Sequence, residues 1–154
     1  TNISEGRGTT RALEILGHPN IDPHQFLEKH KDELSQVCDG VSLRPLYFMP
    51  TFQKFANTSC GGFQWHPTNR DSFRPWRLGQ VLLKLLYREL GSDFTWKPGG
   101  YEYVDNHLPI DVINGNDKIR HWVEQQGGLD DLLHLERQNY TQYLEIMESV
   151  KIYP

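Results

Sequence analysis

Residues 73–91, FRPWRLGQVLLKLLYRELG, carry the strongest structural signal in this chain. Pro75 stands where a helix accepts proline in its first turn, and Gly91 stands where a glycine commonly ends a helix. Between them, apolar residues recur at helical spacing on one face, namely Leu78, Val81, Leu82, Leu85 and Leu86. We predict a helix here and expect its apolar face to lie in the core.

Two further helices are predicted before this one. Residues 11–16 have the pattern of a short helix that Gly17 and Pro19 end. Asp22 can cap the next helix, which carries one apolar stripe made of Phe26, His30, Leu34 and Val37.

Extended segments are predicted on both sides of the central helix. Residues 41–49 are apolar and aromatic like a strand, but Pro45 lacks a backbone N–H, which places this strand at a sheet edge or at a bulge. Residues 62–66 predict a second strand. Residues 94–104 alternate aromatic and polar side chains around Pro98-Gly99-Gly100, which predicts a hairpin or two short strands.

The last third of the chain is mainly helical in pattern. Residues 108–113 are a short apolar piece, and residues 117–126 predict a helix that Gly127-Gly128 ends. One long final helix then follows from the spacing of Leu129, Leu132, Leu133, Tyr140, Leu144 and Met147. The chain therefore predicts an α+β fold, a single domain over residues 1–154 in which a small, mostly antiparallel sheet packs with four to five helices.

Length and charge narrow the class of protein. A chain of 154 residues suits one domain with its own core. The net charge of −4 offers no basic field for phosphate backbones, so nucleic acid is not an expected partner. The longest apolar stretch, residues 81–87, is interrupted by Lys84 and is far shorter than the ~20 residues of a membrane span. Because the chain begins at Thr1 without a leader, we expect a fragment or a processed product, and the residues themselves indicate no cellular location.

Common metal and nucleophile motifs do not occur in the sequence. The seven histidines lack His-Glu-x-x-His or a similar ligand spacing, so we expect no metal and no other cofactor. Gly-x-Ser-x-Gly is also missing. Cys60 with His66 is a candidate nucleophile, and burial as a small apolar residue is the alternative. Cys38 and Cys60 are too few for a disulfide framework, and a single bridge between them stays open.

The first eleven residues, TNISEGRGTTR, are typical of a ligand site. Gly6 and Gly8 can take positive φ and let a ligand approach the backbone, with Arg7 held between them. Thr9 or Thr10 can cap a following helix, whose first N–H groups would face the same space. The alternative is a glycine-rich turn with an ordinary cap.

Aromatic residues offer a second candidate surface. Several lie in predicted strands or loops beside polar groups, which suits sugar binding, although each can equally fill the core; they are Phe63, Trp65, Trp96, Tyr101 and Tyr103. Glu102 lies between two of these rings and must face either solvent or a partner such as Arg7.

Four stretches in this order resemble one bacterial family: TNISEGRGT at 1–9, PTFQK at 50–54, CGG at 60–62 and YEY at 101–103. The family is that of the exo-β-N-acetylmuramidases called NamZ, also known as DUF1343. The resemblance runs along the whole chain. It extends to Phe73-x-Pro75 and to Leu108-Pro109-Ile110-Asp111 with Gly115 shortly after.

The resemblance implies a two-domain enzyme of which this chain is the auxiliary C-terminal domain. An upstream Rossmann-like domain would form the other side of the active-site cleft and is the expected partner. The implied activity is release of terminal N-acetylmuramic acid from peptidoglycan fragments, a hydrolysis that normally needs two carboxylates, at least one of them in the upstream domain. A periplasmic or secreted location is implied as well.

Site residues follow from the resemblance position by position. Asn2, Ser4 and Arg7 are assigned to binding of the sugar or its lactyl carboxylate, and Arg7 is preferred because a guanidinium can hold a carboxylate with two hydrogen bonds. Tyr101 and Glu102 are further candidate substrate-binding residues, and Glu5 is the candidate catalytic acid or base.

The chain departs from the family pattern at three places, one of which is the C-terminal Lys151-Ile152-Tyr153-Pro154 where a Leu-rich ending is usual. Arg11-Ala12-Leu13-Glu14 stands where Arg-Pro-Phe-Glu is usual, and Gly17-His18-Pro19-Asn20 stands where Gly-Ala-Pro-Trp is usual, so two aromatic residues near the expected cleft are replaced.

Two other functions compete with the enzyme. One is a non-catalytic carbohydrate-binding module, in which Trp65, Trp96 and Tyr101 stack on sugar rings, and the other is a structural domain that braces its neighbour.

Overall fold

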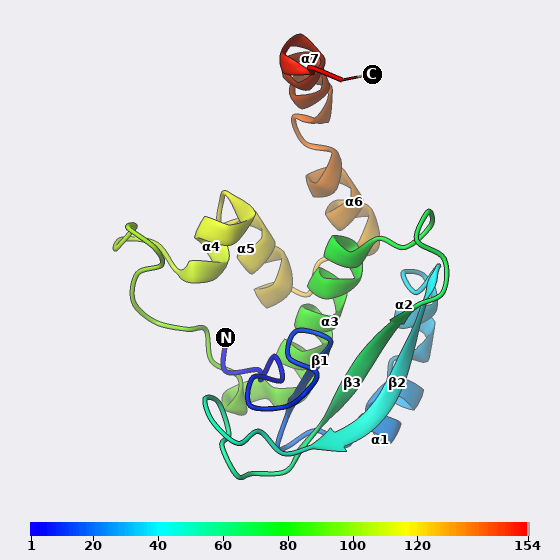
Figure 1. Ribbon diagram of the computed structural model, residues 1–154, viewed down its shortest axis with the longest axis vertical. Helices are drawn as coiled ribbons and strands as arrows, with labels where there is room; N and C mark the ends of the chain where they lie inside the picture. Colours follow the sequence, from blue (N-terminus) through cyan, green and yellow to red (C-terminus); the bar gives the residue numbers. More distant parts are fainter. Residues whose placement is uncertain (154) are drawn as a thin grey trace.

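The computed structural model describes residues 1–153 and contains one antiparallel sheet of three strands. The strands are β1 (Ile15–His18), β2 (Val41–Phe48) and β3 (Cys60–Pro67), in the order β1-β3-β2. Seven α-helices and one 3₁₀ helix, η1 (Gly91–Asp93), complete the regular elements of residues 1–153 (Figure 1). The helices are α1 (Pro23–Lys29), α2 (Lys31–Ser35), α3 (Pro75–Leu90), α4 (Pro109–Asn114), α5 (Lys118–Glu124), α6 (Leu129–Arg137) and α7 (Tyr140–Val150).

The central helix and the two predicted strands are confirmed. Helix α3 starts at Pro75, ends before Gly91 and buries its predicted apolar face in the core. Strand β3 lies in the middle of the sheet, and β2 is an edge strand, as the missing N–H of Pro45 requires. The α+β class with a small antiparallel sheet is therefore correct. The helices outnumber the predicted four or five because two predicted helices are each divided and α4 is an additional one.

The two faces of the sheet have different coverings. Phe63 points into the core, where its ring centroid lies 5.0 Å from that of Phe26 on α1. Since side chains alternate along a strand, Gln64 points to the opposite face, beside its cross-strand partners Ile15 and Arg44. The N-terminal loop packs on this second face, because Gly6 lies directly against the Ile15 side chain.

The prediction of a helix at residues 11–16 is wrong. Residues 11–14 form a turn in which Leu13 takes a left-handed backbone (φ 68°) and donates its N–H to the Glu5 carbonyl at 2.8 Å. Residues 15–18 are strand β1, which pairs with β3. Six residues span fewer than two helical turns, so their apolar spacing does not separate a helix from a strand, and pairing with β3 decides the outcome.

Residues 94–104 do not form the predicted hairpin or strands. Their one β-bridge joins Tyr101 to Val104 and closes a turn. Phe94 and Trp96 instead pack on Tyr87 of α3, with ring centroids 5.1 and 6.1 Å from it. At Phe94 and Trp96 the alternation reflects rings that reach the helical core and not a pleated strand, whereas Tyr103 is exposed.

The predicted long final helix is divided into α6 and α7. Asn139 takes a left-handed backbone (φ 61°), which no continuous helix accommodates. Leu132 of α6 is fully buried, whereas α7 buries none of its residues and projects from the body (Figure 1). Helical spacing therefore predicted both helices correctly but did not show where the chain turns.

Helices α1 and α2, predicted as one helix, meet at a buried histidine. His30 is 3% exposed; its Nε2 lies 3.2 Å from Glu89 Oε2, and its Nδ1 lies 3.1 Å from an Arg88 guanidinium nitrogen. Burial lowers the pKa of His30, and the Arg88 charge lowers it further against the opposing effect of Glu89. Burial also lowers the pKa of His18. Both imidazoles are therefore best accommodated without a proton.

We expect the domain to lose stability as the pH falls through the imidazole range. With a folded-state pKa below the unfolded value of about 6.5, each of these histidines binds more protons when the chain is unfolded. The stability that they contribute is complete above that value and declines below it. Tm measured by circular dichroism should therefore drop between pH 7.5 and pH 5.5, and by less in His30→Gln. A Tm that is flat across this interval would contradict the burial of neutral imidazoles.

Candidate functional site

The N-terminal loop has the backbone that its glycines predicted. Gly6 and Gly8 both take positive φ, at 74° and 82°. Thr9 Oγ1 donates to the Gly6 carbonyl at 2.6 Å, and Thr51 N–H donates to the Gly8 carbonyl at 2.9 Å. The hydroxyl of Thr9 also accepts from the Arg11 N–H, so Thr9 holds a turn and does not cap a helix. The loop is thus tied closed on itself and to the segment at residues 50–54.

Asn2 and Ser4, two of the predicted binding residues, are engaged within the fold. Asn2 donates from Nδ2 to the Asp93 carbonyl at 2.7 Å and accepts the Thr95 N–H at 2.9 Å. Ser4 is buried, and its hydroxyl accepts the Gly6 N–H at 3.3 Å. Both side chains therefore anchor the loop, and the binding roles predicted for them stay predictions.

Glu5 joins two cations. Its Oε1 accepts from Arg7 Nε at 2.8 Å, and its Oε2 accepts from Lys54 Nζ at 2.8 Å; Lys54 also donates to the Ile3 carbonyl. Burial favours a raised pKa for this carboxyl, but the hydrogen bonds and charge of Lys54, with Arg7, outweigh burial and hold the pKa of Glu5 below its usual value. Glu5 is therefore ionised at neutral pH.

Arg7 and the turn at residues 101–104 are not brought together. The Arg7 side chain is 54% exposed, and its recorded partner within residues 1–153 is Glu5. Glu102 lies exposed on the turn with a left-handed backbone (φ 55°), between the half-buried Tyr101 and the fully exposed Tyr103. Of the two destinations considered for Glu102, the structure shows solvent.

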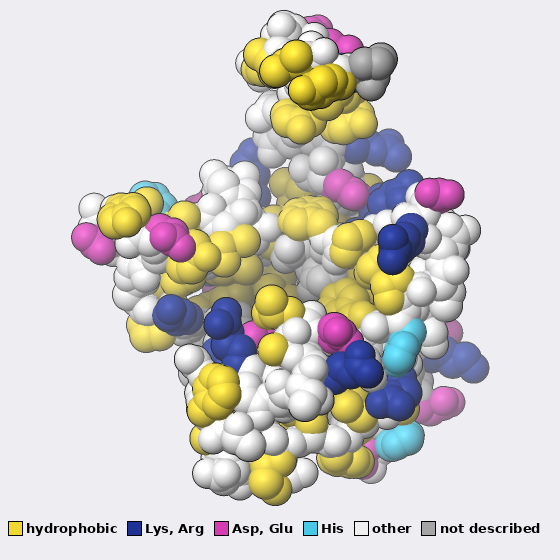
Figure 2. Space-filling model, in the orientation of Figure 1, with side chains coloured by type: hydrophobic (Ala, Val, Ile, Leu, Met, Phe, Trp, Pro, Cys, Tyr) yellow, Lys and Arg dark blue, Asp and Glu magenta, His cyan; other side chains and the backbone are white. Residues whose placement is uncertain are grey.

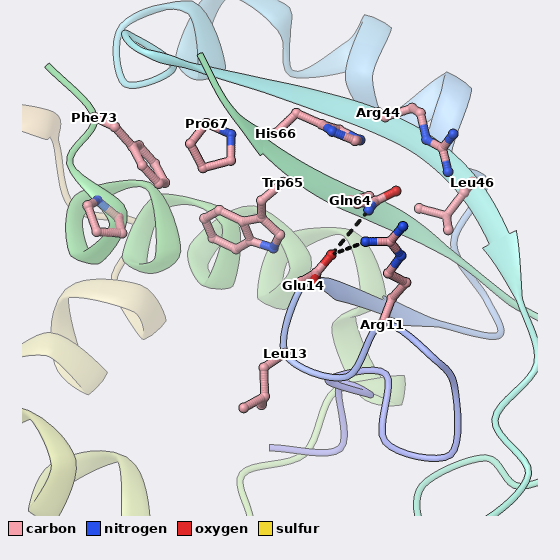
Figure 3. Close-up of a pocket in the computed structure, with 11 residues that line it drawn as sticks. Arg11, Leu13, Glu14, Arg44, Leu46, Gln64, Trp65, His66, Pro67 and Phe73 are labelled. Atoms are coloured by element: carbon pink, nitrogen blue, oxygen red, sulfur yellow. Dashed lines mark hydrogen bonds and ion pairs between the residues drawn. The ribbon is translucent and has the colours of Figure 1, made fainter. Parts of the chain in front are cut away.

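A pocket of about 860 Å³ opens between the 11–14 turn, strands β2 and β3, and the start of α3 (Figure 3). Figure 2 shows a hollow in this view in which hydrophobic side chains gather, with charged groups of both signs at its rim. The pocket is lined by Arg11, Leu13, Glu14, Arg44, Leu46, Gln64, Trp65, His66, Pro67, Phe73 and Pro75.

One end of the pocket is charged. Glu14 Oε2 accepts from Arg11 at 3.0 Å and lies 3.4 Å from Gln64 Nε2. Arg44 stands opposite Gln64 in the β2–β3 register, so its side chain is on the same face. Arg44 and Gln64 were not predicted as site residues from the sequence. Their positions in the two predicted strands carried the signal, but the strand register was needed to pair them.

The other end of the pocket is apolar. Trp65 and Phe73 lie with ring centroids 6.4 Å apart (Figure 3). Pro75, the first residue of α3, also lines the pocket. Leu13 stands at the mouth with 73% of its surface exposed. Of the aromatic residues considered for sugar stacking, Trp65 thus lines a pocket, whereas Trp96 packs against Tyr87 and hydrogen-bonds to Glu124.

Cys60 does not have the environment of a nucleophile. Its side chain is fully buried, burial raises the pKa of its thiol, and Sγ lies 3.7 Å from the Thr58 carbonyl. A buried thiol with a raised pKa supplies little thiolate. The alternative of burial as a small apolar residue is therefore confirmed. Cys38 and Cys60 are both free thiols, so the bridge left open between them is not formed.

The part of the chain that the structure describes shows neither a metal centre nor a membrane-spanning helix. Within residues 1–153, no three histidine, cysteine, aspartate or glutamate side chains are grouped as metal ligands would be. Nor is any helix among these residues both long enough and apolar enough to cross a bilayer.

Comparison with known proteins points to one family. The profile described as "Exo-beta-N-acetylmuramidase NamZ, C-terminal" matches residues 1–153. The chain is 31% identical over 153 residues to the "Peptidoglycan beta-N-acetylmuramidase NamZ" of Bacillus subtilis, and the match covers 99% of this chain but 34% of that protein. The chain therefore spans about a third of the length of this curated relative.

A solved structure shares the fold. A DUF1343 family protein from Bacteroides fragilis superposes with a TM-score of 0.77 at 14% identity, over 99% of this chain and 38% of that one. At this identity the likeness concerns the fold alone. It shows that the small sheet and its surrounding helices form a unit that also occurs within a longer chain.

Proposed function

Because the chain belongs to the family of NamZ C-terminal domains, we propose that it forms one wall of the active-site cleft of an exo-acting glycoside hydrolase. The enzyme would release terminal N-acetylmuramic acid from peptidoglycan fragments. The relative from Bacillus subtilis is named for this type of bond and polymer. An upstream Rossmann-like domain of the same protein would supply the opposite wall, and the periplasm or the cell exterior would be the place of action.

The pocket beside the 11–14 turn is the observation that supports this proposal most directly. Its apolar end, built around Trp65, provides a flat surface for a sugar ring, and aromatic rings beside hydrogen-bonding groups suit that kind of ligand. Its charged end provides the Glu14 carboxylate and the Gln64 amide for hydroxyl and acetamido groups. Few convergent polar groups in a mainly apolar hollow are typical of small-molecule sites.

The carboxylates of this chain indicate which catalytic role each of the two domains would supply. Glycoside hydrolysis commonly needs one carboxyl group that donates a proton and another that acts as base, nucleophile or electrostatic partner. Glu5, with its lowered pKa, is unsuited to donate a proton at neutral pH, and both of its oxygens are already engaged. We place the proton donor in the upstream domain and assign the second role to Glu14, which lines the pocket.

The proposal is tested on the whole protein that carries this chain. We expect it to release the chromophore from a β-linked chromogenic muramide and terminal N-acetylmuramic acid from peptidoglycan fragments. The same assay with the corresponding glucosaminide is the specificity control. A folded protein that releases nothing from either muramic substrate would refute the hydrolase.

A non-catalytic binding module is the second candidate, favoured by one observation. The pocket combines an aromatic ring, Trp65, with the polar groups of Glu14 and Gln64, and these are the two kinds of contact that a sugar-binding module needs. Calorimetry with N-acetylmuramic acid and the chromogenic assay together distinguish the two functions, since the module binds the sugar and leaves the chromogenic muramide intact.

A further inference from the structure

We propose that Arg44 is the residue that recognises the acidic group of the sugar, while Trp65 supports the sugar ring. The inference rests on the proposed function, since it concerns the same pocket, and it names the chemistry of the ligand: an N-acetylated hexose that carries a carboxylate. It also moves the carboxylate-binding role from Arg7, to which the family resemblance assigned it, to a strand residue on the pocket wall.

Arg44 is the available guanidinium of the pocket. Within residues 1–153, no hydrogen bond or ion pair is recorded for its side chain, which is exposed on edge strand β2. Arg11, the other arginine of the lining, already donates to Glu14. Arg7 is not among the lining residues, and its Nε is taken by Glu5. An incoming carboxylate therefore meets an unengaged guanidinium at Arg44 without having to displace an internal partner.

The charge of the lining favours an anion. Two guanidinium groups, those of Arg11 and Arg44, stand against the single carboxylate of Glu14, in a chain whose net charge is −4. Cations gathered in a hollow of an acidic protein concentrate attraction for an anionic ligand at that place. Because Arg presents a planar fork of donors, it can bind a carboxylate with two parallel hydrogen bonds.

The arrangement of the two ends matches the ligand. Trp65 and Gln64 are consecutive on β3 and point to opposite faces of the sheet, and both line the one pocket. The apolar surface extends from Trp65 to Phe73, and the charged groups lie around Gln64 (Figure 3). N-acetylmuramic acid carries one carboxylate on a short lactyl arm, and N-acetylglucosamine is the same sugar without that arm. Because Trp65 and Arg44 line the same pocket, we place the ring at the apolar end and the carboxylate of its arm at Arg44.

The test compares the two sugars on the whole protein. Calorimetry should show that the wild-type protein binds N-acetylmuramic acid more tightly than N-acetylglucosamine. Arg44→Ala should weaken binding of the acidic sugar by roughly 10- to 100-fold, the range for a lost charge-assisted hydrogen bond, and leave the neutral sugar unchanged. Arg44→Lys should recover part of the loss. Arg137→Ala is the matched control, since it removes an equal charge from an exposed position on α6, outside the pocket.

Other results of these measurements would either contradict the role of Arg44 or separate it from the hydrolase activity. Equal weakening of both sugars in Arg44→Ala would show a packing role, and no weakening, or a loss confined to Arg7→Ala, would also overturn the proposal. A wild-type protein that does not prefer the acidic sugar overturns it as well. If binding depends on Arg44 but no muramic acid is ever released, the inference stands and the hydrolase fails. If release occurs and Arg44→Ala retains full affinity, the inference fails and the hydrolase stands.

Discussion

Replacing Gly62 with alanine is expected to destabilise the domain by more than about 3 kcal/mol, a large share of the stability of a domain of this size. A Cβ at this position would overlap the carbonyl oxygen of Leu16 and crowd the backbone of Gly17, both on the paired strand β1. Backbone atoms cannot rotate away as a side chain can. Strand β1 would have to separate from β3, and the sheet would lose a third of its strands.

Gly79→Ala is the matched control for this prediction. Gly79 lies inside helix α3, and an added Cβ would meet no atom within 4 Å. Alanine is favoured over glycine in a helix interior by about 0.5–1 kcal/mol, so this variant should be slightly more stable than the wild type. Urea unfolding followed by circular dichroism measures both changes. If Gly62→Ala lies within about 1 kcal/mol of the wild type, the β1–β3 register described here is wrong.

The two glycines of β3, Gly61 and Gly62, also help to position the candidate pocket. Gly61 meets a similar limit, since a Cβ there would overlap the carbonyl oxygen of Ile21. The stretch Cys60-Gly61-Gly62, which the family resemblance singled out, therefore serves close packing of backbone. That packing sets β1 against β3, and it thereby positions the 11–14 turn, including Glu14, over Gln64.

The parts of the fold that could be predicted are those whose signals are local and long. Helix α3 has sixteen residues with one apolar face and clear end signals, and Pro45 marked the edge strand directly. Strand β1 has four residues, too few for a period, and it exists because β3 offers a partner. The division of the final helix depends on one left-handed residue, Asn139, for which helical spacing gives no warning.

The candidate site was predictable only in part, for a related reason. The positive φ of Gly6 and Gly8 followed from residue type alone. For the polar residues of the same loop, the structure shows that Asn2 and Ser4 hydrogen-bond to backbone groups of the fold, and the binding roles predicted for them stay predictions. The charged end of the pocket is formed by the 11–14 turn and by strands β2 and β3. Arg44 lies near this turn only because β2 pairs with β3, and the sequence does not show that pairing.

Replacing Glu14 with glutamine is expected to lower kcat/KM for a chromogenic muramide by about 100-fold or more in the whole protein, the lower range for loss of a carboxylate that acts in the reaction. Glutamine keeps the size of the side chain and an oxygen that can accept from Arg11, so the pocket should keep its shape while losing the negative charge. The Tm of this variant should therefore stay close to that of the wild type, because the Glu14 side chain is about half exposed.

Glu5→Gln gives the opposite pattern if Glu14 is the carboxylate that acts on the sugar. This change weakens the contacts to Arg7 and Lys54 that hold the N-terminal loop, so it should lower the Tm while reducing kcat/KM less than tenfold. Steady-state kinetics and thermal unfolding of both variants separate the two carboxylates. A larger loss of turnover in Glu5→Gln than in Glu14→Gln would support the catalytic role predicted for Glu5 from the family resemblance, and it would show that the pocket carboxylate only binds. The comparison works because the two acids differ in their surroundings: Glu5 is neutralised by two cations of its own loop, whereas Glu14 shares one arginine and faces the open space where a sugar would lie.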